Sequence, residues 1–232
     1  MYLQRRIVRR ALGLGLLVTL VVLALSACGG ENQQQASKVR PLPEEGQALR
    51  PGEYFSGEFK TPLYFHVGEG WTIDLEMSGA LAITQGEDTL GERRLLGFAN
   101  VQEVYKPSRT GTVTPEKAPQ NMVGWFQKHP YLQTDKPKPV TVGGAKGVQF
   151  DVVVEDLPEE HFGVCGSDCI DLFKLSNDHM HVIGKGEKHR VIVLDDVKSE
   201  TVSIVFASGA TEFDEFVPKA QNVLDTVEWK GA

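Results

Sequence analysis

An uncharged apolar run near the N-terminus determines how much of this 232-residue chain is left to fold as a domain. Residues 11–25 carry no charge, and the ten residues before them hold four arginines and no acid. A basic stretch followed by about 7–15 apolar residues is typical of a secretory signal peptide, whereas a permanent membrane-spanning helix needs about 20. The pattern predicts a signal peptide over residues 1–27, with a permanent membrane anchor as the alternative.

The end of the apolar run favours the signal peptide. Leu25-Ser26-Ala27-Cys28 resembles the lipobox of bacterial lipoproteins, in which Leu and two small residues precede a cysteine. The resemblance implies cleavage before Cys28, a diacylglyceryl group on its thiol and a further acyl chain such as palmitate. Two acyl chains are enough for stable anchoring, at about 0.8 kcal/mol per buried CH₂. The resemblance therefore implies a protein that Cys28 attaches to the extracytoplasmic face of a bacterial membrane.

The stretch that follows, residues 28–49, is rich in Gln, Glu, Pro and Gly and holds few large apolar residues. Such a composition buries too little apolar surface to fold. It predicts a flexible tether with an r.m.s. span on the order of 25 Å. No second change in composition follows, so residues 50–232 are predicted to form a single extracytoplasmic domain.

The charge balance limits what this domain binds. Without the four arginines of the signal peptide, 20 basic residues face 31 acidic ones, and the net charge falls from −7 to −11. Phosphates need basic partners, so this balance argues against nucleic acid as a partner. It also argues against binding to anionic lipid head groups through a charged surface.

Apolar and polar residues alternate in several short runs after residue 50, as they do in strands with one buried face. The clearest runs cover residues 63–67, 148–154 and 201–207, and residues 191–194 are more uniformly apolar. Glycine pairs and acidic stretches between these runs predict turns. Because the strands come in consecutive pairs, the sheet is predicted to be antiparallel.

Two helices complete the prediction. Thr114-Pro115 is suited to an N-terminus, and His129 before Pro130 to an end, which predicts a first helix between them. A second helix is predicted from about Thr211, with one apolar stripe that runs to the C-terminal region. The predicted fold class is α+β, an antiparallel β-sheet covered by two helices.

The order of these elements resembles that of PsbP-like proteins, a group of α/β/α sandwich proteins that includes lipoproteins of actinobacteria. Gly70-Trp71 opens a strand pair, and a helix, a long glycine-flanked hairpin, a second hairpin and an amphipathic helix follow up to Trp229. The resemblance implies a PsbP-like sandwich that serves as a non-catalytic accessory or ligand-binding domain.

Cys165 and Cys169 are the only cysteines after Cys28. An even pair in an exported protein is typical of a disulfide. Closing this short loop contributes about 2 kcal/mol in the chain-entropy model. The sequence therefore predicts a Cys165–Cys169 disulfide.

A metal site is the alternative for the same region. Imidazole and thiolate side chains of the type that binds zinc lie close together in the sequence. They are His161, Cys165, Cys169, His179 and His181. Their spacing differs from that of a zinc finger or ribbon, and a disulfide competes for the two cysteines.

The sequence holds no recognisable catalytic motif. It lacks the G-x-S-x-G of a nucleophile elbow, and its Gly143-Gly144 turn precedes a strand where a phosphate loop precedes a helix. We therefore expect a membrane-anchored, non-catalytic accessory module without a cofactor, which binds an unknown protein or small-molecule ligand. The alternative is a zinc-type metal-binding lipoprotein or a metal-dependent enzyme.

Overall fold

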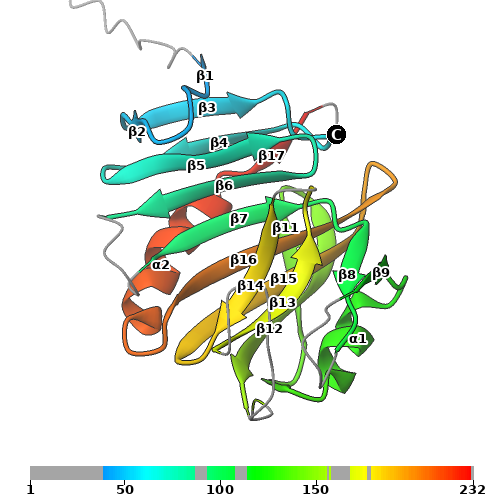
Figure 1. The fold of residues 1–232 in the computed structure, drawn as a ribbon. Coiled ribbons are helices and arrows are strands. Elements are labelled where there is room, and N and C mark those ends of the chain that lie inside the picture. The colour runs from blue at the N-terminus through cyan, green and yellow to red at the C-terminus, as the bar shows by residue number, and fades with distance from the viewer. Residues whose placement is uncertain are drawn as a thin grey trace, which may run out of the picture. The chain divides into compact units, whose positions relative to one another are not determined.

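Seventeen strands and two helices form the part of the chain that the structure, a computed structural model, describes. All of it belongs to one unit, Ser37–Ala232, whose strands are arranged in three sheets (Figure 1). The described residues are 39–86, 93–107, 114–155, 157, 168–176 and 179–230.

The largest sheet, which we call the central sheet, has nine strands, and all of its pairings are antiparallel. Their order is β10-β12-β15-β16-β7-β6-β5-β2, and β11 also pairs with β12. In that order, the strands cover Leu132–Thr134, Ala145–Val154, Glu187–Val197, Glu200–Gly209, Leu95–Ala99, Ala80–Gln85, Trp71–Met77 and Ala48–Leu49, and β11 covers Lys138–Val142.

Two smaller sheets have four strands each. The terminal sheet has the order β1-β3-β4-β17, and the hairpin sheet has the order β14-β13-β8-β9. The strands of the terminal sheet are Arg40–Pro41, Gly52–Ser56, Leu63–Val67 and Glu228–Trp229. Those of the hairpin sheet are Met180–Gly184, Cys169–Lys174, Glu103–Tyr105 and Pro115–Lys117.

One face of the central sheet, which we call the packed face, carries large side chains. Leu81, Phe98 and Phe206 stand on β6, β7 and β16 and are at most 1% exposed. They share a buried cluster with Phe216 and Val223 of α2 (Phe213–Leu224), and side chains of the terminal sheet join the same cluster. The large residues of these alternating strands therefore face a helix and a second sheet.

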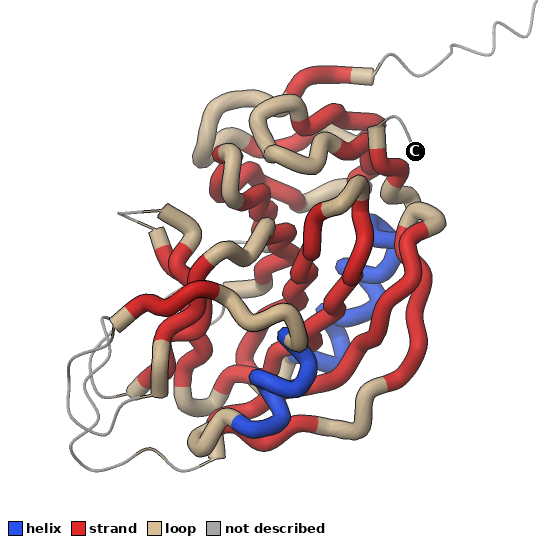
Figure 2. The backbone as a smooth tube through the Cα atoms, turned by 90° about the vertical axis from the view of Figure 1, so that its right-hand side faces the viewer, coloured by secondary structure: helices blue, strands red, loops and turns tan. Residues whose placement is uncertain are grey.

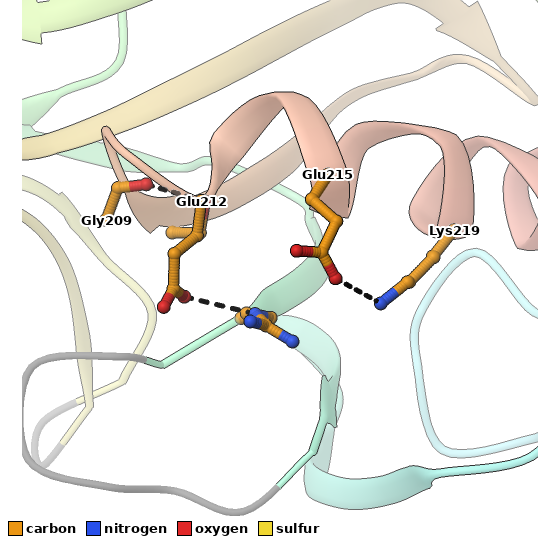
Figure 3. Close-up of polar contacts among 6 residues, drawn as sticks. Gly209, Glu212, Glu215 and Lys219 are labelled. Carbon is orange, nitrogen blue, oxygen red and sulfur yellow. Dashed lines mark hydrogen bonds and ion pairs between the residues drawn. The ribbon is translucent and has the colours of Figure 1, made fainter.

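The start of α2 lies beside β7. The backbone N–H of Glu212 donates to the carbonyl of Gly209 over 3.0 Å, and the Glu212 carboxylate pairs with Arg94 at 3.1 Å (Figure 3). Glu215 pairs with Lys219 one turn further on, at 3.0 Å. Acidic groups in the first turn also suit the positive end of the helix dipole. The predicted second helix is confirmed.

The predicted layering, an antiparallel sheet covered by two helices, is wrong. Strands dominate the described residues, and the two helices are short beside them (Figure 2). α2 shares the packed face with the terminal sheet, and α1 (Met122–Lys128) shares the opposite face with the hairpin sheet. Sheets therefore provide much of the cover that the prediction gave to helices.

The first helix is shorter than predicted because its expected first turn is a strand. Residues 115–117 pair with β8 as strand β9, and Pro119, which has no backbone N–H, separates this strand from the helix. Asn121 caps the helix instead, since its side-chain oxygen accepts the N–H of Gly124 over 2.8 Å. The predicted end at His129 is confirmed.

Paired structure begins before residue 50. Arg40 and Pro41 pair in parallel with Tyr54 and Phe55, and the Arg40 guanidinium donates to the carbonyls of Arg50 and Pro51 at 2.9 and 2.7 Å. Part of the stretch predicted as a tether therefore belongs to the sheets, and residues 28–38 lie outside the described residues.

The C-terminal strand is fixed by its tryptophan. Trp229 is 5% exposed, its indole N–H donates to the carbonyl of Val142 over 3.0 Å, and its ring meets Phe98 edge-on. Gly143 has a φ of +53°, and a Cβ at this position would lie 2.8 Å from the indole ring. The turn between β11 and β12 is therefore closed over the last strand.

Candidate functional site

A pocket of about 360 Å³ lies on the side of the central sheet opposite the packed face. Strands β5, β6, β7 and β16 provide its floor, and the hairpin of β13 and β14 provides a wall. The size falls at the lower end of the range of about 300–1,000 Å³ typical of small-molecule sites. We call this cavity the sheet pocket.

The floor of the sheet pocket is hollow because its residues are small. Ala82 pairs with Gly97, and Gly97 pairs with Val205 on the next strand, so these three share one face. Ala80 and Ala207 widen the same surface. Their neighbours in sequence point the other way, into the packed face. The strands thus place large residues on one side and leave a depression on the other.

Further along the sheet, large side chains cover the same row of residues. Val205 continues through Val191 to Phe150, and there Phe126 of α1 and Phe173 of β13 pack over it. The ring centroids of Phe126 and Phe150 are 5.3 Å apart. The sheet pocket is therefore the uncovered end of a layer that is packed elsewhere.

Two histidines and a glutamate form one corner of the sheet pocket. His189 on β15 is 1% exposed, and its Nε2 lies 3.1 Å from the carboxylate of Glu187. The same carboxylate oxygen accepts the backbone N–H of Gly184 over 2.7 Å. His181 on β14 stacks on Phe173, and its ring centroid is 5.2 Å from that of His189. Three titratable side chains therefore meet beside an apolar floor.

One nitrogen of each ring in this corner lacks a protein partner. His181 Nε2 and His189 Nδ1 are buried and have no hydrogen-bond partner among the described residues. A carboxylate only accepts, so His189 Nε2 carries the proton that it shares with Glu187, and in the neutral ring Nδ1 is an acceptor. Buried polar atoms nearly always bond to something, so these two nitrogens mark where a water or a ligand bonds.

Burial controls the charges of this corner. Burial, together with the nearby positive charges of His189 and Arg93, lowers the pKa of His181 to about 3, so its ring is neutral at neutral pH. Burial acts to raise the pKa of Glu187, but the hydrogen bond and charge of His189 and the N–H of Gly184 outweigh it and lower that pKa. At neutral pH the corner therefore holds a neutral imidazole and an ionised carboxylate.

An ion pair borders the sheet pocket on another side. Arg93 pairs with Asp74 of β5, and their side chains are 45% and 28% exposed. The two charges balance each other at the rim. Among the described residues, the one ion-pair partner that Glu187 has is His189.

The structure tests little of the predicted disulfide and metal site. Cys28, His161 and Cys165 lie outside the described residues, and Cys169 opens β13 as a buried residue. His181 of β14 and His179, which lies just before that strand, both line the sheet pocket. Within the described ranges, however, no three His, Cys, Asp or Glu side chains are grouped as metal ligands.

Sequence reasoning missed His189, Glu187 and the small floor residues. The signal for His189 was its position, because it stands two residues before Val191 in a strand whose inward residues are apolar. The signal for the floor was alternation of small with large residues, as in Ala80-Leu81-Ala82. Both patterns are visible in the sequence, but they indicate a pocket only once the register of three neighbouring strands is known.

Two solved structures are similar to this chain. One is the crystal structure of LpqN, involved in cell envelope biogenesis of Mycobacterium tuberculosis, with 10% sequence identity, 82% of this chain and 87% of that chain covered, and a TM-score of 0.39. The other is the solution structure of the cyanobacterial PsbP (CyanoP) from Synechocystis sp. PCC 6803, with 10% identity, 81% and 98% covered, and a TM-score of 0.39. Similarity at this level carries no role over to this chain.

No family model matches the chain, and neither does any curated protein. Neither helix in the described part of the chain has the length and hydropathy that a membrane span requires.

Proposed function

We propose that this chain is a lipid-anchored extracytoplasmic binding module that takes a small, largely apolar ligand into the sheet pocket. The resemblance of residues 25–28 to a lipobox supports the location. The binding role rests on one observation, an apolar floor that ends at two histidines, each with a buried ring nitrogen that has no partner among the described residues. Small-molecule sites typically combine an apolar lining with a few placed polar groups.

The binding role is tested by filling the pocket. Ala82→Phe places a phenyl ring over the floor, where the neighbouring residues are Gly97 and Leu75. We expect the full-length protein to retain a small molecule through purification, and the variant to lose it while its circular dichroism spectrum stays unchanged. Mass spectrometry of organic extracts from both proteins makes the measurement.

A matched control adds the same ring elsewhere on the central sheet. Ala48 of β2 is exposed and lies away from the sheet pocket, so Ala48→Phe should leave the extract as it is in the parent. If the parent and Ala82→Phe extracts are identical, the pocket does not hold the ligand and the binding role is wrong.

The location is tested at the cysteine. Cys28→Ala removes the thiol that would carry the lipid, so we expect an unprocessed precursor without acyl chains, measured by the intact mass of the membrane-extracted protein. Ser26→Ala keeps a small residue before the cleavage site and should be processed normally. Normal maturation and lipidation of Cys28→Ala would show that the site has been misassigned.

A further inference from the structure

The head group that suits the sheet pocket follows from the charges at its polar corner. We infer that the ligand is an uncharged amphiphile whose hydroxyl head bonds to the imidazole rings of His181 and His189 while its alkyl part lies on the Ala82 and Gly97 floor. This inference rests on the proposed binding function and specifies its ligand class.

One hydroxyl can bond to both nitrogens unless both of them are acceptors. His189 Nδ1 accepts when the ring is neutral and donates when the ring is charged, and His181 Nε2 does either according to its tautomer. A hydroxyl group donates one hydrogen bond and accepts two. The ring centroids lie 5.2 Å apart, so one small head group is within reach of both rings.

An anionic head fits the corner poorly. The Glu187 carboxylate points to the same corner, and its ion-pair partner among the described residues is the His189 ring that the ligand would contact. A carboxylate on the ligand would be repelled by the Glu187 carboxylate. Both groups would also lose part of their hydration in the pocket, which is unfavourable for two charges of the same sign. Arg93 does not offset the cost, because Asp74 already balances it.

A cationic head is also disfavoured, because the surroundings that keep His181 neutral would act against it too. Burial and the charge of His189 oppose a proton on that ring and outweigh the attraction of the Glu187 carboxylate, so its pKa is lowered. An ammonium at the same place would be subject to the same burial and the same repulsion. It also lacks an acceptor for an imidazole N–H.

The apolar part of the ligand has a defined place. The hairpin wall adds Leu175, Met180 and Val182 to the alanine and glycine floor. Methionine adapts its shape to different apolar partners, so this wall suits an alkyl chain better than a rigid ring system. The volume of about 360 Å³ limits the ligand to a short chain.

Three photoreactive probes of equal length test the inference. Each is an eight-carbon chain with a diazirine, and the heads are a hydroxyl, a carboxylate and a primary amine. They are applied at neutral pH to the full-length protein anchored in lipid nanodiscs, and peptide mass spectrometry gives the share of total label that falls on residues 173–189. Using a share corrects for differences in how the probes partition into the lipid.

We expect the share of label on these residues to be about tenfold larger for the alcohol than for the carboxylate or the amine. A preference of this size is typical when one ligand makes a hydrogen bond and another leaves a buried polar group unpaired. His181→Phe keeps a ring stacked on Phe173 but removes Nε2. In this variant the preference for the alcohol should fall severalfold while alkyl labelling of the pocket remains. His181→Gln restores a donor and an acceptor, and should restore part of the preference.

The outcomes separate the two proposals. Equal labelling by all three heads would mean that water satisfies the two nitrogens, and stronger labelling by the carboxylate or the amine would mean a charged ligand; either result overturns the inference and leaves the binding role intact. If no probe labels residues 173–189 above the level seen in Ala82→Phe, the pocket takes no amphiphile, and the proposed function itself fails.

Discussion

Strands β6, β7 and β16 present two faces that differ in how completely they are filled. On the packed face, Leu81, Phe98 and Phe206 are buried against α2 and the terminal sheet. On the opposite face, the same strands offer Ala82, Gly97 and other small residues to a cavity of about 360 Å³. Both faces belong to the same backbone and register, so the difference comes from the size of the side chains and from the elements that cover each face.

The comparison separates what holds the fold together from what is available for binding. Protein interiors are normally packed as densely as organic crystals, so an unfilled layer gives up stability that larger side chains would provide. The packed face supplies that stability. The opposite face then keeps a depression with polar atoms at its edge, and we expect changes to the residues of the pocket floor to do little harm to the fold.

The largest effect should come from emptying the packed face. Phe206 is fully buried in the cluster with α2. Phe206→Ala should lower the free energy of unfolding by about 3–5 kcal/mol, because it removes a buried ring and leaves a cavity. Urea unfolding followed by circular dichroism measures the change. A loss below about 1 kcal/mol would mean that this face does not carry the stability assigned to it.

Acid should act on the polar corner of the opposite face. The pKa of His181 is lowered from 6.5 to about 3 in the folded protein, so the unfolded chain takes up this proton first as the pH falls. The free energy of unfolding should therefore fall between pH 7 and pH 5, by up to about 2 kcal/mol from this residue alone.

The variant His181→Phe isolates this contribution, because it lacks the titrating ring and retains the other histidines. Urea unfolding at both pH values should show a smaller acid loss for the variant than for the parent. The lowered pKa of Glu187 adds a loss only below its ordinary value of 4.5, outside this window. Equal losses in both proteins would show that the His181 ring is not kept neutral by burial.

The smallest effect should come from adding volume to the opposite face. Ala82→Leu extends into the sheet pocket and should change the free energy of unfolding by no more than about 1 kcal/mol in either direction. The same change at Ala220 of α2, which is fully buried in the packed face, should cost about 1–3 kcal/mol. Equal costs in the two variants would remove the distinction between the faces.

The sequence predicted the strands that have one buried face. Leu63, Phe65 and Val67 alternate with polar residues and are buried in β4, and Val202, Ile204 and Phe206 are likewise buried in β16. The alternation of apolar and polar residues is enough to predict such a strand, since it indicates which side chains are buried. Likewise, the apolar stripe after Thr211 predicted α2.

The errors arose where distant residues decide the structure. Residues 115–117 form a strand because β8 pairs with them, and nothing within the segment records that partner. Arg40 reaches the carbonyls of Arg50 and Pro51 across a turn that the Pro- and Gln-rich composition conceals. Likewise, Glu187 and His181 meet His189 through the β14–β15 turn, and the floor of the pocket needs three strands in register.

The position of Trp229 has a consequence for how the core closes during folding. The ring is part of the cluster behind the packed face and also bonds to Val142 at the β11–β12 turn, 87 positions earlier in the chain. Bringing two such distant segments together costs loop-closure entropy, so we expect this part of the core to close late in folding.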